Sequence, residues 1–188
     1  MKRLFLILAG ALALAGCGDD VGSDEDAARA YVGLDKSVDK AMQLGFDGFN
    51  AASSADIPPQ TGKGDKAGTL IIDGKVDQGS SDNKTMSLTE KMTDYSDDGA
   101  ITYNTLGTLP VIDLKLSKIP DGTIDGTLSG EFTMTGELEG PIVLSLTITG
   151  ALQPTAADPM KIERKPDTTK IVGTATSDYG TYNVNVTR

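Results

Sequence analysis

The chain of 188 residues carries 17 basic and 27 acidic side chains, a formal net charge of −10, and contains no Trp, no His and a single Cys. Without His it lacks a Ser/His/Asp triad, a Cys/His pair and any usual zinc site, so we expect no enzyme of these classes. Its acidity disfavours nucleic acid as a partner. The length predicts one domain.

The N-terminus has the organisation of an export signal. Lys2 and Arg3 precede a thirteen-residue apolar stretch, residues 4–16. This order is typical of a signal peptide, and the stretch is too short to remain as a membrane-spanning helix. We expect residues 1–16 to be removed.

The only cysteine stands at the end of this stretch, in the sequence Leu14-Ala15-Gly16-Cys17. These residues resemble the lipobox of bacterial lipoproteins. The resemblance implies cleavage before Cys17, a diacylglycerol on its sulfur and an acyl chain on its new amino group, with no other cofactor. A plain secretory peptide is the alternative, but it leaves a lone thiol in an exported protein unexplained. Several acyl chains anchor a protein stably, and residues 17–23 would form the lipidated tether.

Sorting and charge refine the expected location. Gly18 in the second mature position resembles the signal for the outer membrane, which predicts a protein facing the periplasm or, alternatively, the cell surface. Loss of Lys2 and Arg3 leaves 15 basic against 27 acidic side chains, a net charge near −12. Such an acidic body opposes close approach to anionic headgroups. The lipid is therefore expected to hold the protein at the membrane.

Residues 24–51 predict an amphipathic helix that starts at the N-cap candidate Ser23 and an acidic first turn. The apolar stripe comprises Tyr31, Leu34, Val38, Ala41, Met42, Gly45 and Phe49. The opposite side carries Arg29, Asp35, Lys36, Asp39 and Lys40. Because a sheet needs a cover and the polar side is not strongly basic, packing on a sheet is favoured over lying on a membrane or gripping a partner.

The rest of the chain predicts an antiparallel β-meander. Residues 53–66, with adjacent Pro58 and Pro59 and no periodicity, predict a linker. Period-2 alternation then predicts about eight strands within residues 67–188, separated by turn residues and by a loop over 153–169. The shorter expected strands are 69–77, 85–93, 101–109, 112–117, 170–177 and 181–187. The meander either closes into a small barrel or curves around the helix as a half barrel, which makes residues 24–188 one α+β domain.

The most regular pattern lies between residues 122 and 152, where even positions are apolar or Gly and therefore face a core. Two paired strands that both keep even residues inward need a turn with an odd number of residues. We place this turn at residues 139–141, which sets Phe132 opposite Ile148. The inward glycines indicate a bent strand in preference to a second turn near 129–131.

Four residues of the apolar face form the candidate ligand site. Gly126, Gly130 and Gly136 lack side chains beside Phe132, which predicts a cavity between helix and sheet for an acyl chain or another apolar ligand.

A weak metal candidate consists of Asp94, Ser96 and Asp98, which are spaced like the first half of a calcium loop. Thr105 stands where such a loop needs a bidentate acid, so a plain hairpin turn is favoured and no metal is expected.

These patterns together predict a lipid-anchored cell-envelope protein with a non-catalytic interaction or structural role, its partner being the membrane and an envelope protein. The alternative is a carrier for an apolar ligand, which resembles the half-barrel carriers of the bacterial periplasm in architecture alone. An enzyme built on carboxylates or lysine is the least favoured interpretation.

Overall fold

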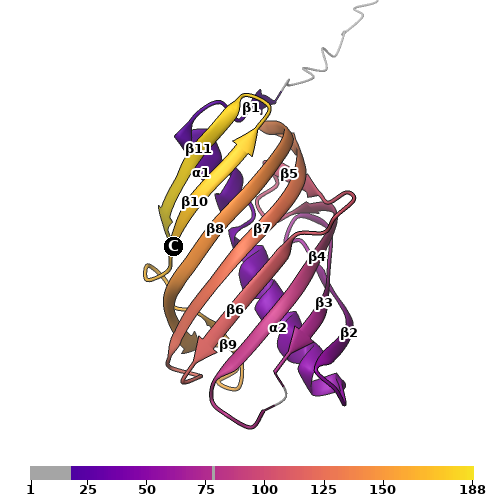
Figure 1. The fold of residues 1–188 in the computed structure, drawn as a ribbon, viewed down its shortest axis with the longest axis vertical. Helices are drawn as coiled ribbons and strands as arrows, with labels where there is room; N and C mark the ends of the chain where they lie inside the picture. The colour runs from indigo at the N-terminus through magenta and orange to yellow at the C-terminus, as the bar shows by residue number, and fades with distance from the viewer. Residues whose placement is uncertain (1–17, 78) are drawn as a thin grey trace, which may run out of the picture.

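The computed structural model describes residues 18–77 and 79–188, which form an α+β structure (Figure 1). The helical segment consists of α1 (Asp24–Val32) and α2 (Asp35–Ala51), with Gly33 and Leu34 between them. Ser23 caps α1, since its Oγ accepts a hydrogen bond of 3.1 Å from the Asp26 N–H. The predicted helix bounds and N-cap are confirmed, whereas the sequence pattern did not indicate the interruption. Among the described helices, none has both the length and the apolar character to cross a membrane.

The sheet contains eleven strands rather than about eight. Their bounds are β1 (Asp19–Asp20), β2 (Asp56–Lys63), β3 (Ala67–Val76), β4 (Lys84–Ser96), β5 (Ile101–Asn104), β6 (Val111–Ser117), β7 (Thr123–Gly136), β8 (Leu138–Pro154), β9 (Ile162–Arg164), β10 (Lys170–Ser177) and β11 (Gly180–Thr187). The main path runs β11-β10-β8-β7-β5-β4-β3-β2, and β6 also lies between β4 and β7. Every pairing is antiparallel except that of β1 with β8. The three strands that the alternation missed are β1, β2 and β9.

Strand β2 corrects the prediction of a linker over residues 53–66. It pairs with β3 alone, and its register shifts between Ile57 and Gln60, where Pro58 and Pro59 stand. Proline has no N–H to donate, so it is tolerated at a bulge of an edge strand. The two prolines hid a strand that forms because β3 offers it a partner.

Strand β1 shows that the segment predicted as a tether is part of the fold from Asp19 onward. Asp19 and Asp20 pair in parallel with Leu138 and Glu139 of β8, and Val21 is buried. The chain therefore meets the sheet two residues after Cys17.

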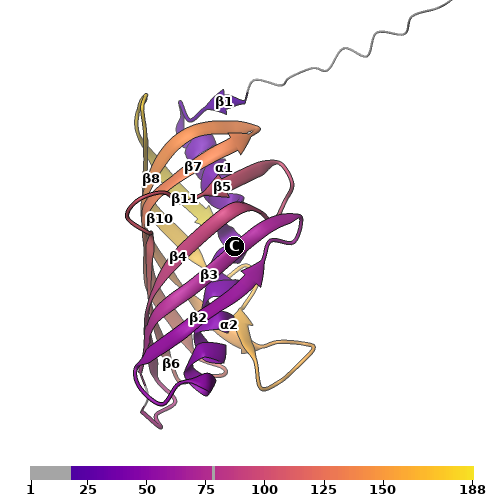
Figure 2. The ribbon, with the colours of Figure 1, turned by 90° about the vertical axis from the view of Figure 1, so that its right-hand side faces the viewer.

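The β7–β8 hairpin has the expected parity and an unexpected turn. Phe132 lies opposite Ile142 rather than Ile148, because the turn is centred on Glu137, three residues earlier than predicted. Gly136 has φ of 120° there, a conformation that glycine adopts without strain. The odd turn is confirmed. Strand β7 continues through residues 129–131 without a second turn and curves with β8 in Figure 2.

The two helices cover one face of the curved sheet (Figure 2) and bury its apolar residues. A Cβ on Gly45 would lie 2.9 Å from Met86 Sδ, and one on Gly48 would lie 2.7 Å from Ile57 Cδ1. Both glycines therefore let α2 approach the strands closely. The prediction that the helix packs on the apolar face of the sheet is confirmed.

Helix α2 also bridges two edge strands, β2 at one end of the main path and β9 beside β8, which do not pair with each other within the described residues. On one side Lys40 Nζ donates a hydrogen bond of 3.0 Å to the Lys63 carbonyl at the edge of β2. On the other side Gln43 Nε2 donates to the Ile162 carbonyl of β9. The sheet thus curves around the helical segment and stays open between β2 and β9.

Candidate functional site

The predicted ligand site is filled by neighbouring protein atoms at its glycines. A Cβ on Gly126 would lie 2.6 Å from the Asp113 carbonyl oxygen, and one on Gly130 would lie 2.5 Å from Pro110 Cα. Gly136 is exposed in the hairpin turn. These close approaches come from β6 and from Pro110 just before it, so the glycines reflect packing within the sheet as well as any ligand.

Phe132, the fourth predicted ligand residue, is fully buried. Its ring packs edge to face against Tyr103, with ring centroids 6.5 Å apart and an interplanar angle of 87°. Cys17, the predicted lipidation site, lies outside the described residues. The four ligand residues remain a prediction.

The weak metal candidate lies at the end of β4, with Asp94 and Ser96, and in the turn that follows, with Asp98. Ser96 Oγ donates to the Ile101 carbonyl at 2.7 Å, and Asp98 Oδ1 accepts from the Ala100 N–H at 2.8 Å. Asp94 is exposed and has φ of 49°. Among residues 18–77 and 79–188, no three acidic side chains are placed to hold a metal ion. The oxygens of Ser96 and Asp98 thus serve the turn itself.

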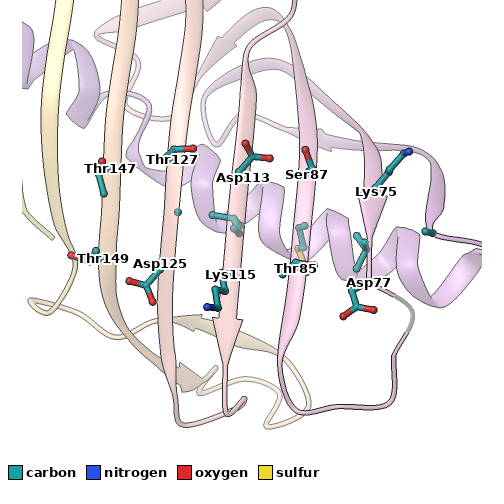
Figure 3. Close-up of a pocket in the computed structure, with 15 residues that line it drawn as sticks. Lys75, Asp77, Thr85, Ser87, Asp113, Lys115, Asp125, Thr127, Thr147 and Thr149 are labelled. Carbon is teal, nitrogen blue, oxygen red and sulfur yellow. The ribbon is translucent and has the colours of Figure 1, made fainter.

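An open groove of about 780 Å³ lies on the face of the sheet opposite the helices and crosses β3, β4, β6, β7 and β8 (Figure 3). Its polar side chains follow two cross-strand rows set by the ladder register. One row comprises Lys75, Ser87, Asp113, Thr127 and Thr147. The other contains Thr85, Lys115, Asp125 and Thr149, with Asp77 beside Thr85. Neighbouring members of a row are about 4.8 Å apart, the strand spacing.

The floor of the groove is the sheet itself. Val76, Met86 and Leu114 belong to its lining, but their side chains are almost fully buried in the core on the other face. Gly126 is the one predicted ligand residue among those that line the groove. Because odd residues point outward on these strands, the two rows are visible as a polar odd face in the sequence. Which of these residues lie side by side across the strands follows only from the strand register in the structure.

The chemistry of the groove suits hydrogen bonding. Five hydroxyl groups, three carboxylates and two ammonium groups surround its floor, and Figure 3 shows them on the same face. Within the described residues, Asp113, Lys115 and Asp125 make no ion pair within 4.0 Å. The rim can therefore offer donors and acceptors to a ligand that carries both.

A cluster of charges fastens α2 to β9 on the open side of the sheet. Asp35 accepts hydrogen bonds from Tyr31 Oη at 2.7 Å, Arg164 Nη1 at 2.9 Å and Arg188 Nε at 3.2 Å. Burial opposes ionisation of Asp35, but the hydrogen bonds and charge of Arg164 lower its pKa below the usual value. Arg164 also binds Asp39. Every charge in this cluster has a partner, which indicates a structural role.

A second cluster fastens the other side of α2 to the sheet. Asp65 accepts from Lys36 Nζ at 2.7 Å and from Lys40 Nζ at 2.8 Å, and these hydrogen bonds lower the pKa of Asp65 to about 2. Lys40 also pairs with Asp97, which accepts the hydroxyl of Tyr95. The sequence pattern placed the charges of α2 on the side opposite its apolar stripe, but it could not indicate their partners, which lie far along the chain.

Glu90 is the buried residue that sequence reasoning missed. It lies on β4, is fully buried, and neither carboxyl oxygen has a hydrogen-bond partner among the described residues. Burial raises its pKa to about 8. A signal was present, because Glu90 occupies the same inward parity as Met86, Leu88 and Met92. Buried polar groups normally have hydrogen-bond partners, so a carboxylic acid within a row of apolar inward residues requires an explanation.

Fold and groove together define an α+β protein with a helix-covered sheet and a polar groove on its uncovered face. In comparisons with known proteins, no family model, no curated protein and no solved structure matches the chain. The interpretation of its function accordingly rests on the residues and geometry described above.

Proposed function

We propose that this chain is a lipid-anchored cell-envelope protein with a non-catalytic role, and that the groove on its uncovered sheet face binds a glycan of the envelope. The anchor rests on the lipobox-like sequence that ends in Cys17. Strand β1 supports a short connection to the bilayer, because the chain joins the sheet at Asp19.

The groove is the observation that carries the binding role. Sugars present many hydroxyl groups, and the groove offers two rows of Ser, Thr, Asp and Lys side chains that can donate and accept hydrogen bonds. The net charge near −12 expected for the mature chain disfavours anionic polymers. A polymer rich in hydroxyl groups therefore fits this surface better than an acidic one.

The lining residues supply hydrogen-bond donors and acceptors, and they lack the groups that activate a Ser or Thr nucleophile. Thr85, Thr127, Thr147 and Thr149 lie in the groove with carboxylates of Asp113 and Asp125, but no His or Cys is available to activate a hydroxyl group. This composition supports binding over catalysis.

The close packing of α2 bears on the carrier alternative. A ligand between helix and sheet needs space, and at Gly45 and Gly48 even a Cβ would come within 3 Å of side chains of Met86 and Ile57. The closed arrangement thus favours a ligand on the uncovered face.

Sedimentation with purified peptidoglycan sacculi tests the proposal. The full chain with Cys17→Ser should co-sediment, and the double variant Thr127→Arg/Thr147→Arg should reduce the bound fraction at least fivefold because the long side chains fill the groove. Asn185→Arg is the matched control on β11, exposed and outside the groove. The glycan assignment fails if the chain that carries only Cys17→Ser stays in the supernatant. It also fails if the Thr127→Arg/Thr147→Arg variant binds as well as the Asn185→Arg variant.

A further inference from the structure

Glu90 places an acid without partners in the interface between α2 and the sheet. Its main-chain N–H is satisfied by the Pro110 carbonyl at 2.9 Å, while both side-chain oxygens lack partners within the described residues. Glu90 follows Leu88 by two residues and therefore points to the same face of β4. That face is covered by α2, since a Cβ on Gly45 would lie 3.1 Å from Leu88 Cδ1.

Helix α2 is held over this acid by polar contacts at its two flanks. Asp39 binds Arg164 on one flank, and Lys40 binds Asp65 and Asp97 on the other. At its N-terminal end the helical path is interrupted at residues 33–34. The helical path thus has a break before α2 and its fastenings lie at the surface, whereas the unsatisfied group lies in the interior.

The surroundings of Glu90 contain few groups able to compensate an ionised carboxylate. Ile72 lies opposite on β3 and carries no charge. Tyr95 lies on the same strand. Burial raises its pKa, and the charge of Glu90 adds to this increase. The Tyr95 hydroxyl donates a hydrogen bond to Asp97. From α2, Lys40 Nζ lies 5.4 Å from the Tyr95 ring centroid and is paired with Asp65 and Asp97. Lys40 is therefore already engaged by two carboxylates.

We propose that Glu90 makes the position of α2 depend on protonation: α2 lies closed on β3 and β4 while Glu90 holds its proton, and it loosens when Glu90 ionises. An ionised carboxylate needs water or a cation, and water reaches this site only if the helix moves. With the pKa of Glu90 at about 8, the change falls in mildly alkaline solution.

Loosening of α2 uncovers the apolar face of the sheet. This face includes Ile72, Leu88 and Ile112, which are fully buried in the closed structure. The open state is thus the one able to take up an acyl chain or another apolar molecule. Closed and open states would expose different surfaces of one protein, and the groove of Figure 3 lies on the face that does not change.

Hydrogen exchange measured by mass spectrometry tests this inference on the full chain with Cys17→Ser. After correction for intrinsic exchange rates, protection of α2 amides should fall at least tenfold between pH 6.5 and pH 9, and at pH 9 it should be at least tenfold lower than the protection of β10 and β11, which open only when the whole chain unfolds. Glu90→Gln, and Glu90→Leu as a second variant, should abolish the change in α2. Glu131→Gln, at an exposed glutamate of β7, is the control and should behave like the unsubstituted chain.

Three results would overturn the inference. These are an α2 whose protection does not change with pH, an equal loss of protection in Glu90→Gln, and protection of α2 that equals that of β10 and β11 at pH 9. The last result would identify global unfolding. None of them depends on the glycan groove, so failure here and failure of the sacculus experiment are distinguishable.

Discussion

Arg164 binds Asp39 through two parallel hydrogen bonds, from Nε to Oδ1 at 2.9 Å and from Nη2 to Oδ2 at 2.8 Å, across a separation of 125 residues. The same guanidinium group reaches Asp35 through Nη1. A short strand near the end of the chain is thereby joined to the first turns of α2. This contact and the Lys40 contacts on the opposite flank hold the helix across the open side of the sheet.

Replacement of Arg164 should therefore be strongly destabilising. Arg164→Met leaves Asp35 and Asp39 without their main partner in a largely buried cluster, and we expect the free energy of unfolding to fall by about 3 to 5 kcal/mol. Urea denaturation followed by circular dichroism measures this change. Lys75→Met removes an exposed pair with Asp56 and should cost no more than about 1 kcal/mol. Equal effects of the two variants would contradict a special role of Arg164.

Stability should fall as pH rises from 4.5 towards 8 because of Glu90. The native state keeps the proton up to about pH 8, whereas the unfolded state releases it near the usual pKa of 4.5. Within this window the unfolded state binds fewer protons, so Glu90 alone contributes a loss of about 1.4 kcal/mol per pH unit. Denaturation of the unsubstituted chain and Glu90→Gln at several pH values isolates this contribution. Parallel stability curves for the two proteins would refute it.

Glu90→Leu should raise stability at pH 8. The substitution removes a buried group whose oxygens lack partners, and we expect a gain of about 1 to 3 kcal/mol in the free energy of unfolding. Most core substitutions destabilise a protein, so a gain would indicate that Glu90 serves a purpose other than stability. Chemical denaturation measures the gain, and a loss of stability would speak against this view.

Gly48→Ala should destabilise the protein although alanine favours helices. The new Cβ would lie 2.7 Å from Ile57 Cδ1 and 2.9 Å from Ile57 Cβ. Overpacking of this kind costs about 1 to 3 kcal/mol, which exceeds the gain of about 1 kcal/mol in helix propensity. The midpoint of thermal unfolding reports the balance. Asn50→Ala on the exposed side of α2 is the control and should leave the midpoint nearly unchanged.

Cys17→Ser should move the protein from the membrane fraction to the soluble fraction of the envelope. The reason is that a chain with an expected net charge near −12 is repelled by anionic headgroups once the lipid is missing. Immunoblots of fractionated cells measure the distribution. Retention of the serine variant in membranes after a high-salt wash would show that Cys17 is not the anchor.

Local patterns in the sequence were sufficient to predict the helix and most strands. The period of 3.6 residues and the cap at Ser23 marked residues 24–51, since both signals arise within a few residues of chain. Period-2 alternation marked eight strands for the same reason. Parity required an odd turn between β7 and β8, but Gly136 and Gly140 are both suited to a turn. The turn forms at Gly136 because β7 pairs with β5 and β6 up to that residue.

Only the tertiary structure decided the features that join distant parts of the chain. Pro58 and Pro59 made β2 resemble a linker, and β3 supplied the partner that turned it into an edge strand. The sequence contains the outward Ser and Thr residues of the groove, yet their rows exist because of the register of five strands. The fastening of α2 by Arg164 has the same origin: long-range contacts depend on chain topology, and no local pattern encodes which distant charges will meet.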